Sequence, residues 1–345
     1  MAVAQRITAA APAAIETLLR YGVRFDRATT GALSLGLEAA HARRRIVHAT
    51  GDGSTGRAIM RALSDAVRAI PSITVLEGLE ARRLLVVDGA ISGSGVLATS
   101  SSGTVLLPTG RVVIATGGVG GLFLHSTNPR GAFGQGLALA VRAGAVLVDM
   151  EFVQFHPTAL DTDSPPLTLV SEAARGEGAT LVDETGTRFM DTTPGKELAP
   201  RDVVAGAVWR HMSEGHRVFL DARHALGSDF ARHFPVFAAS CAIAGIDPAI
   251  RPIPIRPAAH YHMGGIKVDQ AGCSSLRGLW ACGEAASTGL HGANRLVSNS
   301  LSAPDGSPTA WLRRPPGKGV RTSLRCCRRP PTPPRYAPFC RAQPV

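Results

Sequence analysis

Side chains that can bind anions are spread over seven short polar segments between residues 151 and 301. Each segment places His, Arg, Ser or Glu among Gly, Ala and Pro, where a plain core would carry Leu and Val. Guanidinium and imidazole groups donate directed hydrogen bonds to carboxylates. The pattern therefore predicts that the segments converge on a small anionic ligand. They read EFVQFHPT (151–158), SEAARGEGA (171–179), RFM (188–190), ELAPRD (197–202), AAHYHMGG (258–265), ACGEAASTGLHGANR (281–295) and SNSL (298–301).

Arg201 is the first candidate for chemistry, within the segment ELAPRD. Pro200 restricts the backbone of the residue before it, and Asp202 can orient the guanidinium group. A guanidinium group stays protonated in ordinary surroundings, so a role in proton transfer requires a special environment or a relay. The alternative is an ordinary Arg–Asp pair at the exposed start of a helix.

Two histidines and one further arginine are candidates for binding carboxylates. His156 precedes a proline, which favours an extended backbone, and His260 lies beside a glycine turn that permits close approach of a ligand. Arg295, in HGANR, is a candidate carboxylate clamp. The alternative for a lone histidine is a hydrogen-bonded core or surface residue. We keep that interpretation for His262 and His291.

The elements that must position these residues begin with an amphipathic helix that carries Ile15, Leu18 and Leu19 on one face and ends at Gly22. A strand–helix–strand unit is expected next, then a β-meander, a buried strand entering a glycine turn, a helix and a last strand. The expected ranges are 46–50, 57–70 and 73–77 for the first unit, 83–88, 91–98 and 103–107 for the meander, and 111–118, 133–143 and 145–149 for the rest.

Residues 150–262 are richer in Pro, His and charge, and we interpret them as a separate α+β capping domain with helices near 201–214 and 228–244. Strand-like segments and glycine turns resume in residues 263–301. The predicted fold class is therefore α/β, in which a first domain (1–149) is interrupted by the cap and continues in 263–301.

Residues 302–345 differ in composition from the rest of the chain. They hold ten of the 24 prolines, three of the six cysteines, nine of the 37 Lys and Arg residues and one acidic residue, Asp305. This segment therefore supplies +8 of the net charge of +11, and the first 301 residues carry +3. A disordered tail and an out-of-frame translation of GC-rich DNA both explain such a composition, and we favour the second. We expect no nucleic-acid partner, although a basic tail can bind phosphates weakly.

The remaining composition predicts a cytoplasmic protein without a metal site. The cysteines form no C-x-x-C pair, so neither a zinc site nor a disulfide framework is indicated. No apolar run approaches the roughly 18–20 residues of a membrane span, and we expect no membrane partner.

The segment GDGSTG (51–56) matches the G-x-G-x-x-G pattern of dinucleotide-binding turns. An expected strand precedes it, an expected helix follows it, and Glu77 ends the next expected strand. On pattern alone the segment is a candidate for binding a pyrophosphate at a helix N-terminus.

The residues and the order of the polar segments resemble the motifs of the flavoprotein family of L-aspartate oxidase, fumarate reductase and succinate dehydrogenase. Within this family, L-aspartate oxidase is the most similar form. The resemblance runs from about residue 13 to Leu301. It implies an incomplete Rossmann-like FAD-binding domain, because the family's fingerprint lies upstream of the stretch that GDGSTG resembles, and we therefore interpret GDGSTG as a decoy. We expect the missing fingerprint and closing helix to leave this chain weakly active or inactive.

The resemblance assigns proton transfer at the reacting carbon to Arg201. It implies that His156, Ser171, Glu172, His260 and Arg295 bind the substrate, with Arg175 nearby. Glu38, in LEAAHARRRI (37–46), resembles the aspartate oxidase form, in which a carboxylate receives the substrate ammonium group. The alternative for Glu38 is an exposed helix residue.

The resemblance also implies non-covalent FAD. Gln135 departs from the acidic residue often found at its position, and Glu284 is placed to bind ribitol or ribose. The expected FAD-binding residues are Thr116, Gly117, Gly118, Gln135, Glu284, Ser298, Ser300 and Leu301.

The function that the resemblance implies is oxidation of L-aspartate to iminoaspartate, with oxygen or fumarate as the acceptor. The product would feed quinolinate synthesis for NAD, which implies a functional link to quinolinate synthase. Two alternatives stay open: a fumarate reductase or succinate dehydrogenase flavoprotein subunit, and a residual fragment that is not an enzyme.

Overall fold

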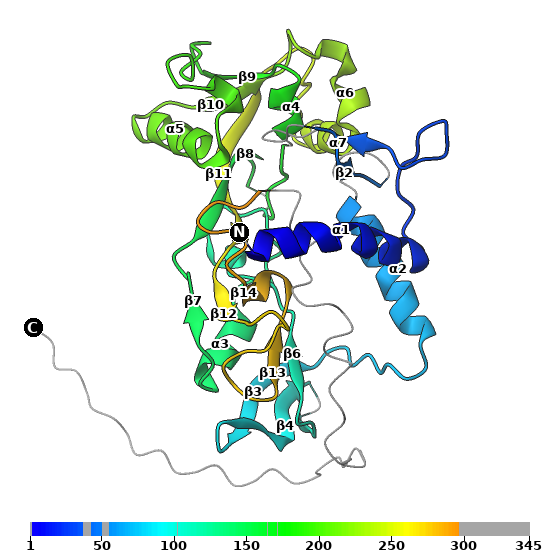
Figure 1. Ribbon diagram of the computed structural model, residues 1–345. Helices are drawn as coiled ribbons and strands as arrows, with labels where there is room; N and C mark the ends of the chain where they lie inside the picture. The colour runs from blue at the N-terminus through cyan, green and yellow to red at the C-terminus, as the bar shows by residue number, and fades with distance from the viewer. Residues whose placement is uncertain are drawn as a thin grey trace, which may run out of the picture.

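The computed structural model describes residues 2–36, 43–49, 55–101, 103–163, 165–170 and 172–296. In these residues the chain forms an elongated mixed α/β molecule with an upper end, a lower end and an N-terminal region packed on one flank (Figure 1). The candidate residues Glu38, Ser171, Ser298, Ser300 and Leu301, most of GDGSTG and the segment 302–345 lie outside the described residues.

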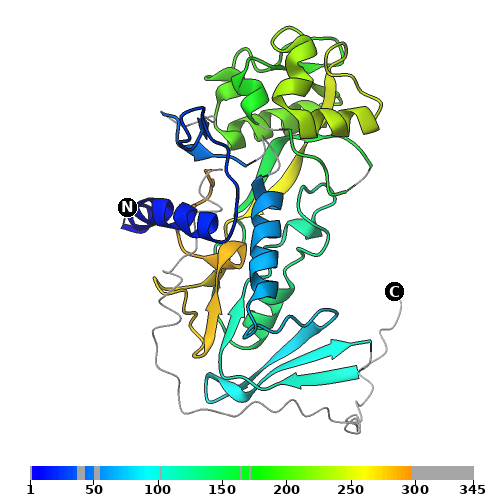
Figure 2. The ribbon, with the colours of Figure 1, turned by 90° about the vertical axis from the view of Figure 1, so that its right-hand side faces the viewer.

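The upper end is built on a four-stranded antiparallel sheet in the order β8-β11-β10-β9. Helices α4–α7 surround this sheet (Figures 1 and 2). Its core includes Leu181, Val204, Leu220, Phe230 and Ile253, all of them buried. The elements are β8 (Val153–Leu160), α4 (Glu172–Gly176), β9 (Thr180–Asp183), α5 (Arg201–Ser213), β10 (Val218–Asp221), α6 (Phe230–His233), α7 (Pro235–Ile243) and β11 (Ile253–His262).

The lower end combines several small sheets around a second core that includes Leu84, Ile114, Leu137 and Ile266. An antiparallel meander of three strands forms the base of the molecule (Figure 2). Above it, β6 pairs in parallel with β13, while β12 pairs with β7 and β14. The elements are β3 (Glu80–Val87), β4 (Ala90–Ser100), β5 (Gly103–Leu107), β6 (Val112–Ile114), α3 (Gln135–Arg142), β7 (Leu147–Val148), β12 (Gly265–Lys267), β13 (Leu279–Ala281) and β14 (Ala286–Ser287).

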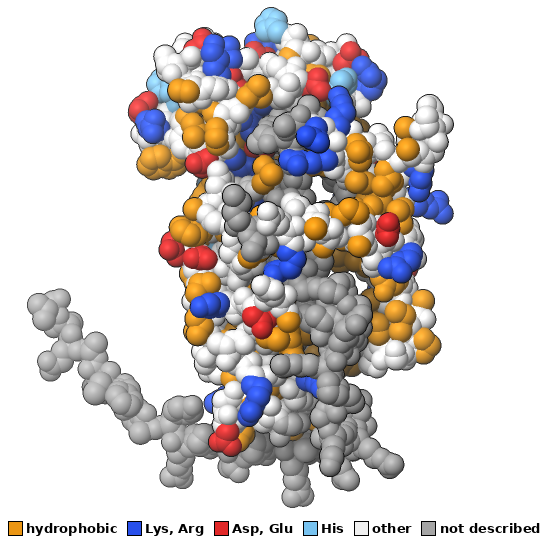
Figure 3. Space-filling view, in the orientation of Figure 1, with side chains coloured by type: hydrophobic (Ala, Val, Ile, Leu, Met, Phe, Trp, Pro, Cys, Tyr) orange, Lys and Arg blue, Asp and Glu red, His pale blue; other side chains and the backbone are white. Residues whose placement is uncertain are grey.

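The N-terminal region consists of α1 (Ala2–Arg20), the strand pair β1 (Leu35–Gly36) and β2 (Ile46–Val47), and α2 (Thr55–Ala69). The predicted apolar face of α1 packs against Val23, Phe25, Ala49 and Ile59. Gly22 follows the helix with φ +92°, a backbone conformation that suits glycine. Hydrophobic side chains remain exposed over α1 and α2 (Figure 3), including Met60.

The predicted strand at 73–77 is wrong. Residues 71–79 form turns and loop, and Ile73, Val75 and Leu76 are exposed. None of the described strands pairs with this segment, and β2 pairs with β1 instead. The strand–helix–strand unit therefore has no second strand, and Glu77 does not end one, which agrees with the interpretation of GDGSTG as a decoy.

The predicted helix at 228–244 is divided into α6 and α7. Phe234 lies between them with φ −129° and ψ 62°, outside the helical region. The division is expected before Pro235, because proline disfavours a helical backbone at the residue that precedes it. No helix in the described part of the chain is long and apolar enough to cross a membrane.

Strand β11 leads from the upper core toward the lower end and carries the segment AAHYHMGG (Figure 1). Its pairing with β8 shifts register twice, between Arg256 and Ala258 and between Ala259 and Tyr261. The second irregularity contains His260. Bulges of this kind redirect side chains and bend strands, and they occur often next to functional sites.

Candidate functional site

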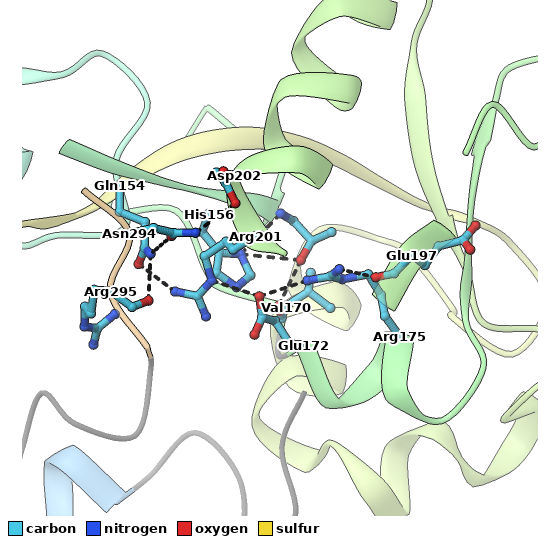
Figure 4. A network of polar contacts seen from close by, with 11 residues as sticks. Gln154, His156, Val170, Glu172, Arg175, Glu197, Arg201, Asp202, Asn294 and Arg295 are labelled. Atoms are coloured by element: carbon cyan, nitrogen blue, oxygen red, sulfur yellow. Dashed lines mark hydrogen bonds and ion pairs between the residues drawn. The ribbon is translucent and has the colours of Figure 1, made fainter. Parts of the chain in front are cut away.

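Arg201 occupies the first position of α5, where it is buried and fixed by two side chains (Figure 4). Its Nε donates to Glu172 Oε1 at 2.8 Å, and its Nη1 donates to Gln154 Oε1 at 3.0 Å. The same Glu172 oxygen accepts from Arg175 Nη2 at 3.0 Å. Glu172 thus links two arginines, one from its own short helix and one from α5.

The charges in this group decide the protonation of Glu172. Burial raises the pKa of its carboxyl group. The hydrogen bond and charge of Arg201, with the charge of Arg175, lower this pKa by a larger amount, so that it ends below its usual value. Glu172 is therefore ionised at neutral pH. For Arg175, burial lowers the pKa of the guanidinium group, while the charge of Glu172 opposes that shift.

Gln154, on β8, connects Arg201 to the segment that contains Arg295. The Gln154 Nε2 group donates to Asn294 Oδ1 at 2.7 Å and to the Arg295 carbonyl oxygen at 2.8 Å. Asn294 in turn donates to Asp202 Oδ1 at 2.8 Å. The prediction that Asp202 orients Arg201 is wrong, because Glu172 and Gln154 do so and Asp202 binds Asn294.

His156 is fully buried and neutral, with one ring nitrogen already engaged. Its Nδ1 accepts from the Thr158 backbone N–H at 3.2 Å, which places the ring proton on Nε2. Burial lowers the pKa of His156, and Arg201 lowers it further. Among the described residues, no hydrogen-bond partner reaches His156 Nε2. A buried N–H without a partner is costly, so this nitrogen is a good donor to a ligand oxygen.

His260 lies against His156, with the two ring centroids 5.4 Å apart at an interplanar angle of 70°. Its Nδ1 lies 2.7 Å from Thr127 Oγ1. Burial lowers the pKa of His260 to about 3, and Arg295 and Arg201 add to this shift. Both histidines are therefore neutral at physiological pH and contribute hydrogen bonds rather than charge.

Arg295 is held by an aromatic ring. Its guanidinium carbon lies 4.1 Å from the centroid of the Tyr261 ring, within the range of a cation–π interaction. Burial and the neighbouring Arg201 charge lower the pKa of Arg295 to about 10, which still leaves it protonated at neutral pH.

The charges of this group do not cancel. Arg175, Arg201 and Arg295 bring three positive charges, and the carboxylate of Glu172 between them brings one negative charge. Two further carboxylates lie at the edge of the group, Glu284 near Arg295 and Asp202 bound to Asn294. The nearby Glu197 carboxylate is matched by a bidentate ion pair with Arg188, at 2.9 and 2.6 Å. The excess of positive charge, with neutral imidazoles beside it, favours an anion with more than one carboxylate.

A second group lies where two parallel strands end. Ile114 of β6 is paired with Ala281 of β13, so the glycine turn 115–118 and the loop that contains Glu284 leave the same edge of the sheet. Ligands of open α/β sheets bind at the carboxyl ends of parallel strands. Gly117 has φ +77°, and Thr116 is exposed.

Gly118 and Glu284 are in close contact. A Cβ atom on Gly118 would lie 2.7 Å from Glu284 Oε1 and 2.7 Å from His262 Cβ, so only glycine fits. The Glu284 Oε1 atom accepts from the His262 backbone N–H at 2.8 Å. Burial raises the pKa of Glu284. A carboxylate accepts several hydrogen bonds, and this one has capacity left for the hydroxyls of a sugar or ribitol.

The structure brings His156, Glu172, Arg201, His260 and Arg295 into one neighbourhood. Gln135 is the first residue of α3, which packs so tightly on the glycine turn that a Cβ on Gly136 would lie 2.0 Å from Thr116 Oγ1. The sequence-based choice of site residues omitted those that hold the others in place: Gln154, Tyr261, Thr127 and Asn294. Gln154, Tyr261 and Asn294 lie inside quoted polar segments, but none of them carries the charge that drew attention to their neighbours.

Comparison with known proteins places these observations in a family. The sequence signature described as FAD binding domain matches residues 2–301. The L-aspartate oxidase of Mesorhizobium japonicum is 61% identical over 300 residues, which cover 87% of this chain and 58% of that protein. The L-aspartate oxidase of Agrobacterium fabrum is 61% identical over 295 residues, with 86% and 56% covered. The chain thus spans somewhat more than half the length of these relatives.

Solved structures agree with the sequence relatives. A mutant of the FrdA chain of Escherichia coli quinol fumarate reductase superposes with a TM-score of 0.78 at 33% identity, covering 86% of this chain and 54% of that one. A quinol-fumarate reductase with menaquinol molecules gives a TM-score of 0.80 at 33% identity, covering 87% and 55%.

The described residues fit a flavin nucleotide, because the glycine turn admits a close approach and Glu284 offers an acceptor beside it. From the match over residues 2–301, and from the flavoprotein fold that surrounds these groups, the chain belongs to the FAD binding domain family and FAD is its cofactor.

Proposed function

We propose that this chain carries the substrate site of an L-aspartate oxidase, which converts L-aspartate to iminoaspartate. One observation carries the proposal: three guanidinium groups and two neutral histidines surround a single ionised carboxylate, Glu172. This arrangement suits a four-carbon dicarboxylate. The 61% identity with two L-aspartate oxidases supports the choice of substrate.

In this proposal the histidines and Arg295 bind the substrate carboxylates. His156 Nε2 donates one hydrogen bond, and the Arg295 guanidinium, braced by Tyr261, supplies charge. His260 lies beside His156 and supplies a further hydrogen-bond donor. Ser171 and Glu38 remain predicted contacts, Ser171 to a substrate carboxylate and Glu38 to the ammonium group.

Arg201 and Glu172 would handle the proton. Oxidation removes a hydride from the substrate α-carbon and a proton from its nitrogen. The hydrogen bonds to Glu172 and Gln154 fix the Arg201 guanidinium, and the shared oxygen of Glu172 connects it to Arg175. This chain of contacts forms a relay that would carry a proton away without requiring Arg201 to exist free of its proton.

FAD, when bound, supplies the acceptor for the hydride. Glu284, Gly117, Gly118 and Thr116 are the described residues that would hold it. Gln135, Ser298, Ser300 and Leu301 are further predicted contacts. Oxygen or fumarate would then reoxidise the cofactor, and iminoaspartate would pass to quinolinate synthase in the cytoplasmic synthesis of NAD.

Ligand binding and turnover test separate parts of this proposal. We expect the purified chain, supplied with FAD, to bind aspartate and succinate in calorimetry at least about tenfold more tightly than alanine, which lacks the second carboxylate. Equal affinity for all three would overturn the dicarboxylate site. Release of hydrogen peroxide from aspartate tests turnover with oxygen as the acceptor.

A fumarate reductase or succinate dehydrogenase subunit is the second candidate, favoured by TM-scores of 0.78 and 0.80 with fumarate reductases. Glu38→Gln separates the two. An aspartate oxidase loses affinity for aspartate and keeps its affinity for succinate, because only aspartate carries an ammonium group. A succinate or fumarate enzyme is indifferent to the substitution.

A further inference from the structure

A second polar cluster lies at the opposite end of α5 from Arg201. His211 is in the last turn of α5, His216 follows in the loop that leads to β10, and Asp183 ends β9, which pairs with β10. One ligand atom from each of the three residues lies within 4.8 Å of the other two. Two imidazoles and a carboxylate form a donor set that suits zinc and similar divalent ions.

Asp183 is held so that one of its oxygens faces the histidines. Its Oδ1 atom accepts from the Thr185 backbone N–H at 2.9 Å, from Thr185 Oγ1 at 2.6 Å and from the Thr187 backbone N–H at 3.0 Å. These bonds, the Thr185 hydroxyl first, lower the pKa of Asp183 to about 2. The carboxylate is therefore ionised, and its Oδ2 atom lies toward His211.

The distance between Asp183 and His211 already matches a metal site. Asp183 Oδ2 and His211 Nε2 are 3.3 Å apart. Zinc–nitrogen and zinc–oxygen bonds of about 2.0–2.2 Å at tetrahedral angles place two ligands about 3.3 Å apart. These two atoms therefore already have the spacing that a shared ion requires.

His216 needs one rotation to join them. Its ring is stacked on that of His211, with centroids 4.2 Å apart and an interplanar angle of 9°, and parallel rings cannot direct their nitrogens at one ion. His211 is fixed from the other side by Phe189, at 4.5 Å. His216 is partly exposed, and its Nδ1 contacts Glu184 Oε1 at 2.9 Å.

The surrounding charge favours a cation. Glu214 Oε2 lies 3.8 Å from His211 Nδ1, and Asp183 and Glu184 add two more carboxylates. Two arginines adjoin these histidines in sequence: Arg210 is exposed, and Arg217 directs its guanidinium over the Phe219 ring. The C-terminal end of α5 adds the negative pole of the helix dipole.

We propose that Asp183, His211 and His216 bind a zinc-class divalent cation that fastens the end of α5 to β9 and β10. Ten residues of helix, roughly 15 Å at 1.5 Å per residue, separate His211 from Arg201. The ion would therefore be structural and would take no part in the oxidation. The spacing of five residues between the histidines differs from the i, i+4 pair of helical metal motifs, so the sequence pattern did not reveal the site.

The test uses the full chain with its accessible cysteines alkylated under native conditions, which leaves the buried Cys241 unmodified, so that exposed thiols cannot bind the metal. We expect cobalt(II) to produce a visible absorption band at one equivalent, zinc to displace it, and zinc to raise the Tm by at least about 3 °C. His216→Gln and His211→Gln should each abolish the band and the shift, while the exposed control His224→Gln should keep both.

Failure to bind one equivalent, or binding that survives both histidine substitutions, would overturn the site. Because the readouts are spectroscopic and thermal, they are independent of aspartate turnover. A chain that binds metal but does not oxidise aspartate refutes the proposed function alone.

Discussion

The substrate side and the flavin side of the proposed site hold their ligands by different means. Around Arg201, buried charged side chains supply the binding groups, and each one is fixed by another side chain. Around Gly118, the binding surface is mostly backbone, and the space is so tight that a methyl group would collide with Glu284. The first side is therefore sensitive to loss of charge, and the second to gain of volume.

Arg201→Gln should give the largest effect. The amide keeps a donor for Gln154 but removes the guanidinium, and we expect a drop of about a thousandfold in aspartate-dependent reduction of FAD. Stopped-flow absorbance measures the rate. Arg232→Gln, an exposed residue paired with Asp229, is the matched control. A drop below about fivefold would remove Arg201 from the chemistry.

Gly118→Ala tests whether the flavin side is sensitive to added side-chain volume. The added Cβ meets Glu284 and His262 at 2.7 Å, so we expect a loss of about 1–3 kcal/mol in unfolding free energy, together with weaker flavin retention. Gly131→Ala is the control, because nothing lies within 4 Å of its Cβ. Urea unfolding and the flavin absorbance of the purified protein report the two effects. Equal behaviour of the two variants would contradict the tight contact.

The neutral histidines predict a pH dependence on the substrate side. An unfolded histidine binds a proton near pH 6.5, whereas His260 in the folded chain resists protonation down to about pH 3. His260 therefore leaves the free energy of unfolding unchanged above pH 6.5. As the pH falls from 6.5 toward 3, it lowers the free energy of unfolding by about 1.4 kcal/mol per pH unit for one proton. His156, whose pKa is also lowered, acts in the same direction.

His260→Gln should make this slope shallower by about one proton between pH 6.5 and 5, and exposed His233→Gln should leave it unchanged. Urea unfolding at a series of pH values measures the slope. A wild-type slope of zero in this range would show that the two imidazoles are protonated in the folded chain.

Substitutions of Tyr261 should give the smallest effect, and they distinguish the contribution of the ring from that of the hydroxyl group. Tyr261→Leu removes the cation–π contact with Arg295 and should weaken succinate binding by about fivefold to tenfold, whereas Tyr261→Phe keeps the ring and should stay within about twofold. Calorimetric titration decides between them. Equal losses in both variants would assign the effect to the Tyr261 hydroxyl, which lies 3.5 Å from His291 Nε2.

Local patterns predicted those elements that have a partner nearby in the chain. The apolar spacing in 57–70 predicted α2, and the three short strands predicted the meander, because each meander strand pairs with its neighbour in sequence. The strand predicted at 73–77 fails for the opposite reason. Its apolar residues are typical of a strand, but a strand forms only where a partner lies beside it, and none of the described strands pairs with residues 73–77.

The site residues divide in the same way: the charged ones could be predicted from local sequence, and the neutral residues that support them could not. Charged residues in glycine-rich and proline-rich segments were visible as candidates, and His156, Glu172, Arg201, His260 and Arg295 do lie together. Their neutral supports were not visible, since Gln154 joins β8 to residues 140 and 141 positions later. Such contacts depend on the packing of β8 against β11 and the returning segment, which spacing along the chain does not encode.

The register shift in β11 limits which changes in length the protein can tolerate. The extra residue at His260 sets the direction of the side chains that follow it on that strand, those of Tyr261 and His262. Deleting one residue there would restore regular pairing and turn the following side chains to the opposite face. Homologues and engineered variants should therefore conserve the number of residues between Ile253 and Gly265 even where they change the residues themselves.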